Sequence, residues 1–383
     1  MSSEIFPVLL PAFIYAGVLM LIGVPGNLLV IVVYVRRMTR TTSRHFIISL
    51  AVYDFLNCTF GMPVELTLLF NFYNFDYPII CKLSRFANFV MNNGSACVLI
   101  CIAVDRFRRV CMPLKPNMTV THSKILCTTF TVVSIICALP ALFIYNTVSI
   151  PLQKLVNVSQ PVLDLKTCYI DSTAGVSLPL AYNLYLFISI VLMILTLVII
   201  YALIGRVISS QKKLSRPDRG HLSTMTSVDA TTFRANTFKS RLLRSVSERS
   251  FLKASKSHSP IGTPETIPAL GRRSPNIRFA TPETPGTMRR HGGQAIRAGR
   301  TALVLFVVTL VFILSFMPYV VLGTLRFISP STLHNLNSSQ LTLYHFTLRS
   351  YLLNSAANPL IYCFLNRHFR QKAASLFKCK NSK

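Results

Sequence analysis

One otherwise apolar stretch, residues 81–109, carries polar side chains at the spacing of a helix. The intervals are 3, 4 and 3 along the series Arg85, Asn88, Asn92 and Ser95, which places the four on one side of a helix. A guanidinium, two amides and a hydroxyl can bind a ligand through hydrogen bonds and charge. The alternative is that the amides and the hydroxyl only join neighbouring helices.

A second set of polar residues falls at matching depth in several apolar stretches. It contains one carboxylate, and its members are Asn27, Asp54, Ser95, Asn354, Ser355 and Asn358. A lone carboxylate in hydrocarbon is costly, so Asp54 must meet polar partners. The cluster could hold a sodium ion or a proton, and the alternative is a static hydrogen-bond network. Apart from this sodium site we expect no metal and no cofactor.

No arrangement typical of an enzyme is present. The chain lacks a hydrolytic triad, a His and Cys set with metal-ligand spacing, and a glycine loop for phosphates. Asp105-Arg106-Phe107 ends one apolar stretch, and Pro318 and Pro359 interrupt two others. Because a proline inside a helix removes a hydrogen bond and bends it, the sequence predicts two hinges. We expect a protein that relays a conformational change and catalyses no reaction.

Seven apolar stretches must position these residues. The 383 residues are 51% hydrophobic and 14% charged, with a mean hydropathy of +0.50. The 25 steps from Cys81 to Arg106 make ~38 Å of helix, enough to cross a hydrocarbon core of about 30 Å. The sequence therefore predicts an all-α membrane protein, a seven-transmembrane helix bundle, with spans at residues 8–35, 45–71, 80–109, 122–146, 178–210, 297–327 and 343–365.

Basic residues predict the orientation of these spans. Lys and Arg follow the first span, lie between the third and fourth, and follow the seventh, and short basic loops stay in the cytoplasm. Residues 1–7 are then a short extracellular amino terminus with no separate signal peptide. Asn157 and Asn337 are glycan acceptors in outer loops, whereas Asn117 fits the same pattern on the inner side and should stay unmodified.

Two cysteines fall on the outer, oxidising side of this topology. Cys81 opens the third span, and Cys168 lies in the long loop between the fourth and fifth. The sequence predicts a disulfide between them that holds the loop over the bundle.

The inner side carries two further segments. Residues 211–296 are rich in Ser, Thr, Pro, Gly and Arg and are predicted to form a disordered basic third cytoplasmic loop against anionic membrane lipids. Residues 366–383 are predicted to form a short amphipathic eighth helix and a tail. Cys379 is an acylation site or a plain surface thiol. Although the net charge is +28, no base-reading module is present, so we expect no nucleic-acid partner.

Several motifs, in order along the chain, resemble those of the rhodopsin-like (class A) G-protein-coupled receptors. They are Gly26-Asn27, Leu50-Ala51-Val52-Tyr53-Asp54, Cys81, Asp105-Arg106-Phe107 in place of the usual Asp-Arg-Tyr, Phe312-x-x-Ser315-Phe316-x-Pro318, and Asn358-Pro359-Leu360-Ile361-Tyr362 followed by Phe369. The resemblance covers nearly the whole chain outside residues 211–296. It implies a multi-pass receptor of the plasma membrane.

The chain departs from the family pattern at several positions. It has no tryptophan, and Phe316 stands at the position in span six where the family normally has the tryptophan of its activation switch. Met193 occupies the place of the span-five proline. Asn88 stands where amine receptors carry an aspartate, which argues against a monoamine ligand. Ala298 replaces an acid that locks Arg106 in some members, so we expect Asp105 alone to restrain Arg106.

The resemblance implies a ligand pocket in the outer half of the bundle. Its expected residues are Glu65, Arg85, Asn88, Asn92, Phe316, Tyr319, Arg326 and Tyr351. The two cations Arg85 and Arg326 suit a carboxylate or an acidic peptide end, unless Glu65 simply pairs with Arg85. The resemblance also implies an inner cleft and switch formed by Asp105, Arg106, Tyr201, Pro318, Pro359 and Tyr362.

The expected function is that of a receptor. An extracellular ligand, a peptide first and a small organic acid or lipid next, would favour a packing with an open inner cleft and activate a heterotrimeric G protein. Arrestin and kinases are the other implied partners. Two alternatives stay open: an ion-coupled transporter that uses Asp54, although no internal repeat is seen, and a non-signalling seven-helix family member.

Overall fold

The computed structural model describes residues 2–151, 164–171, 175, 177–214, 285–328 and 336–377. The chain forms two compact units, residues 1–211 with 289–383 and residues 212–288. The first unit contains the elements described below, apart from the ends of two helices at residues 212–214 and 285–288. Asn157, Cys379 and most of the predicted loop 211–296 lie outside the described residues.

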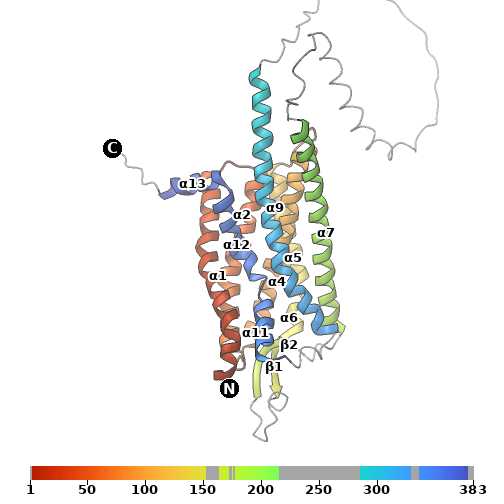
Figure 1. The fold of residues 1–383 in the computed structure, drawn as a ribbon. Helices are drawn as coiled ribbons and strands as arrows, with labels where there is room; N and C mark the ends of the chain where they lie inside the picture. The colour runs from red at the N-terminus through yellow and green to blue at the C-terminus, as the bar shows by residue number, and fades with distance from the viewer. Residues whose placement is uncertain are drawn as a thin grey trace, which may run out of the picture. The chain divides into compact units, whose positions relative to one another are not determined.

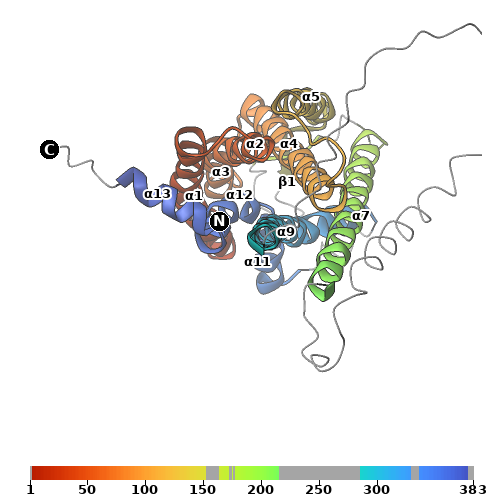
Figure 2. The same cartoon turned by 90° about the horizontal axis from the view of Figure 1, so that it is seen from above.

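The described part of the chain is mostly helical (Figure 1). Its elements are α1 (Ser2–Arg37), α2 (Thr42–Leu56), the π-helix η1 (Asn57–Gly61), α3 (Met62–Phe70), α4 (Pro78–Cys111), α5 (Val120–Ala138), α6 (Ala141–Ile144), β1 (Tyr145–Pro151), β2 (Asp164–Ile170), α7 (Ser177–Leu214), α9 (Pro285–Ile328), α11 (Ser338–Thr347), α12 (Leu352–Leu365) and α13 (Arg367–Phe377). Seen from above, α5 lies on the outside of the bundle, against α2 and α4 (Figure 2).

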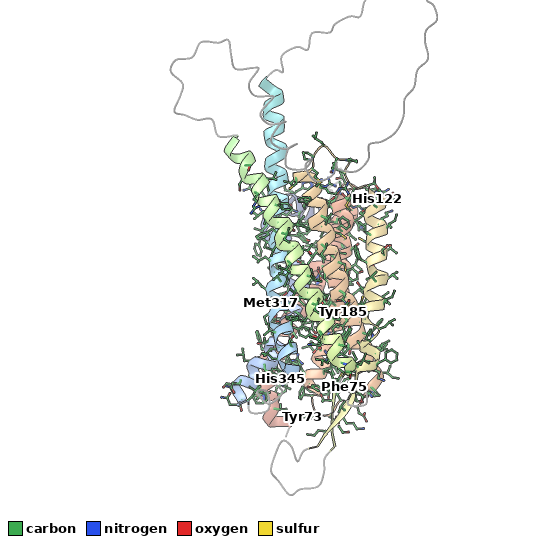
Figure 3. All side chains as sticks on the ribbon, turned by 90° about the vertical axis from the view of Figure 1, so that its right-hand side faces the viewer. Tyr73, Phe75, His122, Tyr185, Met317 and His345 are labelled. Carbon is green, nitrogen blue, oxygen red and sulfur yellow. A yellow bond between two sulfur atoms is a disulfide. The ribbon has the colours of Figure 1, made fainter. Side chains whose placement is uncertain are left out.

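The two ends of the bundle differ. We call the end that carries β1 and β2 the hairpin end, and the other the α13 end. Tyr73, Phe75 and His345 lie at the hairpin end, and His122 lies at the opposite one (Figure 3). α4 runs without interruption from one end to the other, as the length from Cys81 to Arg106 predicts.

Six helices are long and apolar enough to cross a membrane among the residues that the structure describes. They are Ile5–Arg37, Thr42–Phe70, Pro78–Cys111, Val120–Ile144, Ser177–Ser210 and Leu303–Leu325. They correspond to the first six predicted spans. The helices α7 and α9 also extend into the predicted loop 211–296, as far as Leu214 and from Pro285. The seventh predicted span is present in two pieces, α11 and α12.

Both α9 and α12 continue as helix through Pro318 and Pro359, and the predicted hinges there stay a prediction. The seventh span also has a break that the prolines did not predict, at residues 348–351. There the backbone bonds reach back three residues, as in Arg349 N to Phe346 O at 3.0 Å and Leu352 N to Arg349 O at 3.0 Å, which tightens the chain relative to an α-helix.

The second and fourth spans also contain unpredicted irregularities. η1 is inserted between α2 and α3, so the second span includes one wider turn. The predicted fourth span, 122–146, agrees with the span Val120–Ile144, but it is not one regular helix, because α5 stops at Ala138 and a short α6 follows Pro140. The chain then enters strand β1 at Tyr145.

A β-hairpin closes the hairpin end of the bundle. β1 and β2 are antiparallel, with Thr147 opposite Cys168. Cys168 is joined to Cys81 at the start of α4, with a Cα–Cα distance of 5.5 Å, so the predicted disulfide is confirmed. Lys166 bonds through its backbone to Tyr73 and Phe75 in the loop before α4. The hairpin is thus fixed both to α4 and to the loop that precedes it.

The predicted amphipathic helix after the seventh span is α13. Phe369 is fully buried and stacks on Tyr34 at a ring distance of 6.0 Å. Arg370 donates to the carbonyls of Cys363 and Phe364 at the end of α12, which satisfies acceptors that a helix end leaves open. α13 therefore turns away from the end of α12 and stays packed on α1 (Figure 1).

A close contact between α1 and α12 gives a test of this packing. A Cβ atom added to Gly26 would lie 2.8 and 2.9 Å from ring carbons of Pro359, whereas one added to Gly17 would meet nothing within 4 Å. Since a proline ring cannot rotate away, we expect Gly26→Ala to destabilise the protein by about 1–3 kcal/mol. Gly17→Ala is the matched control. Equal melting temperatures for the two purified variants would contradict this packing.

Candidate functional site

A cavity of about 240 Å³ lies near the hairpin end. Helices α3, α4, α7, α9 and α11 surround it, and residues from the hairpin cover it. Its lining includes seven of the eight residues that the sequence predicts for a ligand pocket, namely Glu65, Arg85, Asn88, Asn92, Phe316, Tyr319 and Tyr351. The eighth is Arg326, whose side chain lies outside the described part of the chain.

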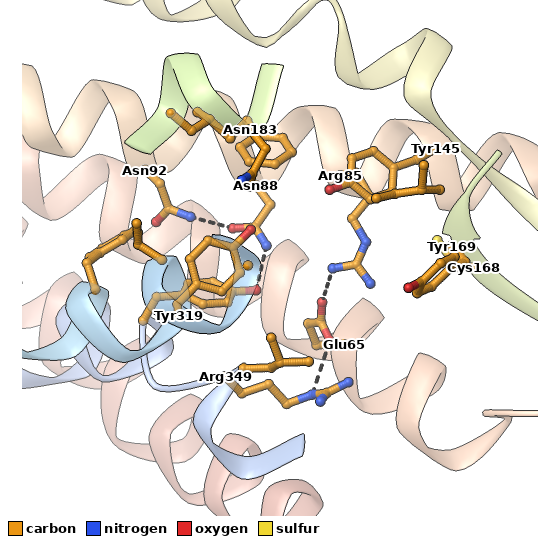
Figure 4. Close-up of a pocket in the computed structure, with 18 of the residues that line it drawn as sticks. Glu65, Arg85, Asn88, Asn92, Tyr145, Cys168, Tyr169, Asn183, Tyr319 and Arg349 are labelled. Carbon is orange, nitrogen blue, oxygen red and sulfur yellow. Dashed lines mark hydrogen bonds and ion pairs between the residues drawn. The ribbon is translucent and has the colours of Figure 1, made fainter. Parts of the chain in front are cut away.

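Three charged side chains form an ion cluster in this cavity. Glu65 Oε1 is 2.5 Å from Arg85 Nη1, and Glu65 Oε2 is 3.4 Å from Arg349 Nε. Figure 4 shows the carboxylate between the two guanidinium groups. Only 5% of the Glu65 side chain is exposed, so its charge depends on these partners. Arg85 also lies over the ring of Tyr145, at 5.9 Å from its centroid, which is within the range of a cation–π contact.

A chain of hydrogen bonds joins the polar stripe of α4 to the seventh span. Asn92 Nδ2 donates to Asn88 Oδ1 at 2.6 Å, and Asn88 Nδ2 donates to the Tyr351 hydroxyl at 2.7 Å (Figure 4). The Tyr351 ring in turn contacts Tyr319 and Phe316, at centroid distances of 5.1 and 5.9 Å. Arg85, Asn88 and Asn92 of the stripe therefore face the cavity, and their contacts reach the broken turn at 348–351.

Sequence reasoning missed several residues of the pocket. Among the described side chains, Arg349 is a second cation that pairs with Glu65. The hairpin and α7 supply further lining residues, among them Tyr145, Thr167, Tyr169, Ile170, Asn183 and Leu186. A basic residue inside an apolar span is itself a signal of a buried ion pair, so Arg349 could have been found from the sequence.

Below the pocket, the predicted midplane residues form a buried polar cluster. Asn358 Nδ2 donates to Asp54 Oδ2 at 2.6 Å. Asn27 Nδ2 donates to the Ser355 carbonyl at 2.8 Å. Asn57, which was not predicted, donates to Ser355 Oγ at 3.0 Å. Ser95 and Asn354 are also buried, but the side chain of Asn354 has no hydrogen-bond partner among the described residues.

The cluster contains unused acceptors. Five of its buried side-chain oxygens have no hydrogen-bond partner within the described parts of the chain, and they belong to Asn27, Asp54, Asn57, Asn354 and Asn358. Hard cations such as sodium take oxygen ligands, and buried water fills the same need. The residues present therefore fit a small cation or bound water.

At the α13 end, Asp105 joins α4 to the start of α2. Its carboxylate accepts from Thr42 and Ser43, both at 3.1 Å. It pairs with Arg109 at 3.0 Å and lies farther from Arg106, at 3.6 Å. Arg106 also donates to the Ser43 hydroxyl. The expectation that Asp105 alone restrains Arg106 is therefore wrong, because Ser43 on α2 shares this role.

The remaining switch residues line the same end or the bundle core. Tyr201 and Thr309 lie within hydrogen-bond distance through their hydroxyls, at 3.3 Å, which joins α7 to α9. Tyr362 is fully buried between Tyr34 and Phe369. Asn337, the described glycan acceptor, is exposed and caps the start of α11; its modification stays a prediction.

Comparison with known proteins identifies the family of this chain. Residues 26–362 match the family described as 7 transmembrane receptor (rhodopsin family). The chain therefore belongs to that family and is a multi-pass membrane receptor.

Individual relatives agree with this assignment. The chain is 24% identical to a cholecystokinin receptor of Xenopus laevis over 95% of its own length and 77% of that protein. It is 28% identical to the tachykinin-like peptides receptor 99D of Drosophila melanogaster and 30% identical to the growth hormone secretagogue receptor type 1 of Mus musculus. Those matches cover 37% and 33% of this chain, and only 27% and 36% of the relatives.

A solved structure shows the same fold. The crystal structure of squid rhodopsin superposes with a TM-score of 0.65, at 18% identity, over 97% of this chain and 86% of that one. This likeness supports a bundle of seven spans in which α11 and α12 together form the seventh.

Proposed function

We propose that this protein is a plasma-membrane receptor with its amino terminus outside, which binds a peptide and activates a heterotrimeric G protein. One observation carries the proposal: α4 has a polar, hairpin-covered cavity at one end and the Arg106 network at the other. A ligand that binds one packing of such helices more tightly increases the population of that packing, and this changes the structure at the far end of the bundle.

The relatives favour a peptide over other ligands. Their names describe receptors for cholecystokinin and tachykinin-like peptides. Aromatic and amide side chains in the pocket here, such as Phe316, Tyr319 and Asn183, can contact a peptide's side chains and backbone. A small organic acid or a lipid is the next candidate ligand. Arrestin, kinases and membrane lipids are the further partners that we propose.

The test is nucleotide exchange on purified G proteins. Cells that express the chain are screened with a peptide library, and active peptides are then tested for loading of a GTP analogue on each G-protein class. Peptide-dependent loading is the expected result. Substrate uptake that is unaffected by GTP would favour a transporter, and no response at normal surface expression would favour a non-signalling member of the family.

We also propose that the midplane cluster holds a sodium ion, supported by its unused oxygens. Asp54→Asn removes the charge, so we expect the sodium dependence of nucleotide exchange to fall by about fivefold or more. The measurement compares basal loading in sodium chloride and in choline chloride of equal ionic strength. Ser134→Ala, which removes a buried hydroxyl that bonds within α5 and lies outside the cluster, is the control. If Asp54→Asn keeps the response of the parent chain, the cluster is a static hydrogen-bond network.

A further inference from the structure

One edge of strand β2 pairs with β1, and the other edge pairs in part with a different segment of the chain. The Lys166 N–H donates to the Tyr73 carbonyl at 3.1 Å, and the Lys166 carbonyl accepts from the Phe75 N–H at 2.9 Å. Together these bonds form a parallel β-bridge between Lys166 and Asn74, in the loop before α4. Both backbone groups of Lys166 therefore point away from β1.

Beyond Lys166, the same edge of β2 is open. The backbone groups of successive strand residues point to alternate edges, so those of Cys168 and Ile170 point the same way as those of Lys166. Asp171 agrees with this alternation, because its N–H donates to the Ile144 carbonyl, next to β1, at 2.8 Å. Among the described residues, the backbone N–H and C=O groups of Cys168 and Ile170 have no partner on this edge. Donors and acceptors of the main chain are thus available there.

This open edge faces the pocket. The consecutive residues 167–170 of β2 all line the cavity. Side chains of a strand alternate between its two faces, so a strand that met the cavity with one face would line it with every second residue only. The unbroken run means that β2 meets the cavity with an edge, and β1 occupies its other edge. Figure 4 shows Cys168 and Tyr169 on the side of the pocket where Arg85 and Tyr145 lie.

We propose that the ligand binds as an extended strand along this edge of β2, with its backbone hydrogen-bonded to Cys168 and Ile170. The bridge at Asn74 shows that the edge already pairs with a strand-like segment, and the ligand continues this pairing along the pocket. Pairing at an open sheet edge gives affinity through the main chain of a peptide, and its alternate side chains give specificity. The inference rests on the proposed function and adds the mode of binding: an extended peptide segment with unsubstituted amide N–H groups at every second residue.

The open edge also distinguishes between classes of ligand. An extended peptide supplies donors and acceptors at the spacing of a strand, ~7 Å for two residues. A lipid tail supplies neither, and a polar group that loses water without gaining a partner costs about 1–3 kcal/mol. A small organic carboxylate has acceptors but no donor for the carbonyls of Cys168 and Ile170. The edge therefore favours a peptide over the other two candidates.

The first experiment scans the backbone of a bound peptide. The probe is a library of acetyl-capped hexapeptide amides, which is offered to the purified full chain in detergent, and the retained peptides are identified by mass spectrometry. The tightest of them is then remade with one N-methyl group at each position in turn. We expect N-methylation to weaken binding by about tenfold at alternate positions, because a hydrogen bond is lost and its acceptor is left unpaired. The positions between should change much less.

Variants of the hairpin test the same pairing from the receptor side. Ile170→Pro removes an N–H of the open edge and leaves the bonds between β1 and β2, since proline is tolerated where a strand's N–H is not part of the ladder. It should weaken the tightest peptide by about tenfold, whereas Ile170→Val keeps the N–H and should retain binding. Ser149→Pro is the matched control: Ser149 lies opposite Lys166, so its N–H points to the far edge of the hairpin, and binding should be retained.

Weakening at consecutive positions or at none, equal binding to the parent and Ile170→Pro proteins, or retention of no peptide would overturn the proposal. If Ile170→Pro does not fold, the N-methyl scan on the parent chain decides. The outcome is separable from that of the proposed function. Nucleotide exchange driven by peptides without the alternating pattern would keep the receptor function and remove the strand pairing. Alternating binding without any exchange would keep the site and remove the function.

Discussion

Glu65→Gln is expected to destabilise the folded protein by about 3–5 kcal/mol, the cost of removing one partner from a buried ion pair. The substitution preserves the shape of the side chain but leaves Arg85 and Arg349 facing each other across the cavity without the carboxylate. The measurement is the melting temperature of the purified protein, together with the amount that reaches the cell surface.

Two further variants make this prediction specific. The double variant Glu65→Gln with Arg349→Gln removes one of the two cations that pair with Glu65 and should recover part of the lost stability. Asp76→Asn is the surface control, because Asp76 is 56% exposed and its pair with Lys166 is of the kind that contributes at most about 1 kcal/mol. A Glu65→Gln protein as stable as the Asp76→Asn protein would refute the role given to the ion cluster.

Asp105→Asn is expected to raise basal nucleotide exchange by about fivefold or more. Asp105 is 2% exposed and accepts from Thr42, Ser43 and Arg109, so its carboxylate ties α4 to the start of α2. Loss of the charge frees Arg106 and Arg109 at the α13 end. The measurement is loading of a GTP analogue without ligand, at matched surface expression.

The comparison variant for this switch is Ser43→Ala. It removes the hydroxyl that both Asp105 and Arg106 contact but keeps the ion pairs, so a smaller rise is expected. If Asp105→Asn leaves basal exchange unchanged or lowers it, the tie between α4 and α2 does not restrain the inactive packing.

The sequence predicts most of this architecture because the membrane allows few alternatives. An apolar stretch of sufficient length must be helical in lipid, and polar residues within it must face inward. These two rules account for the spans and for the clusters around Asn88 and Asp54. The disulfide between Cys81 and Cys168 follows from the same topology.

The errors arise where local geometry depends on tertiary partners. Proline marks a lost hydrogen bond but does not locate breaks elsewhere: the helices continue through Pro318 and Pro359, and the seventh span breaks at other residues. The break at 348–351 coincides with contacts of Arg349 and Tyr351 to other helices. Contacts between helices cannot be read from the sequence of one span alone. Strand β1 did leave a local signal: Thr147, Val148 and Ile150 are β-branched, although they follow an apolar run that is typical of a helix.

The central claim is that the pocket end and the Arg106 end face opposite sides of a membrane. Single cysteines at Tyr77, 59% exposed before α4, and at Leu114, fully exposed after it, are labelled on intact cells with a membrane-impermeant thiol reagent, with the parent chain as background. The account predicts labelling of Tyr77→Cys on intact cells and of Leu114→Cys only after permeabilisation. The reverse pattern, or labelling of both from one side, would contradict it.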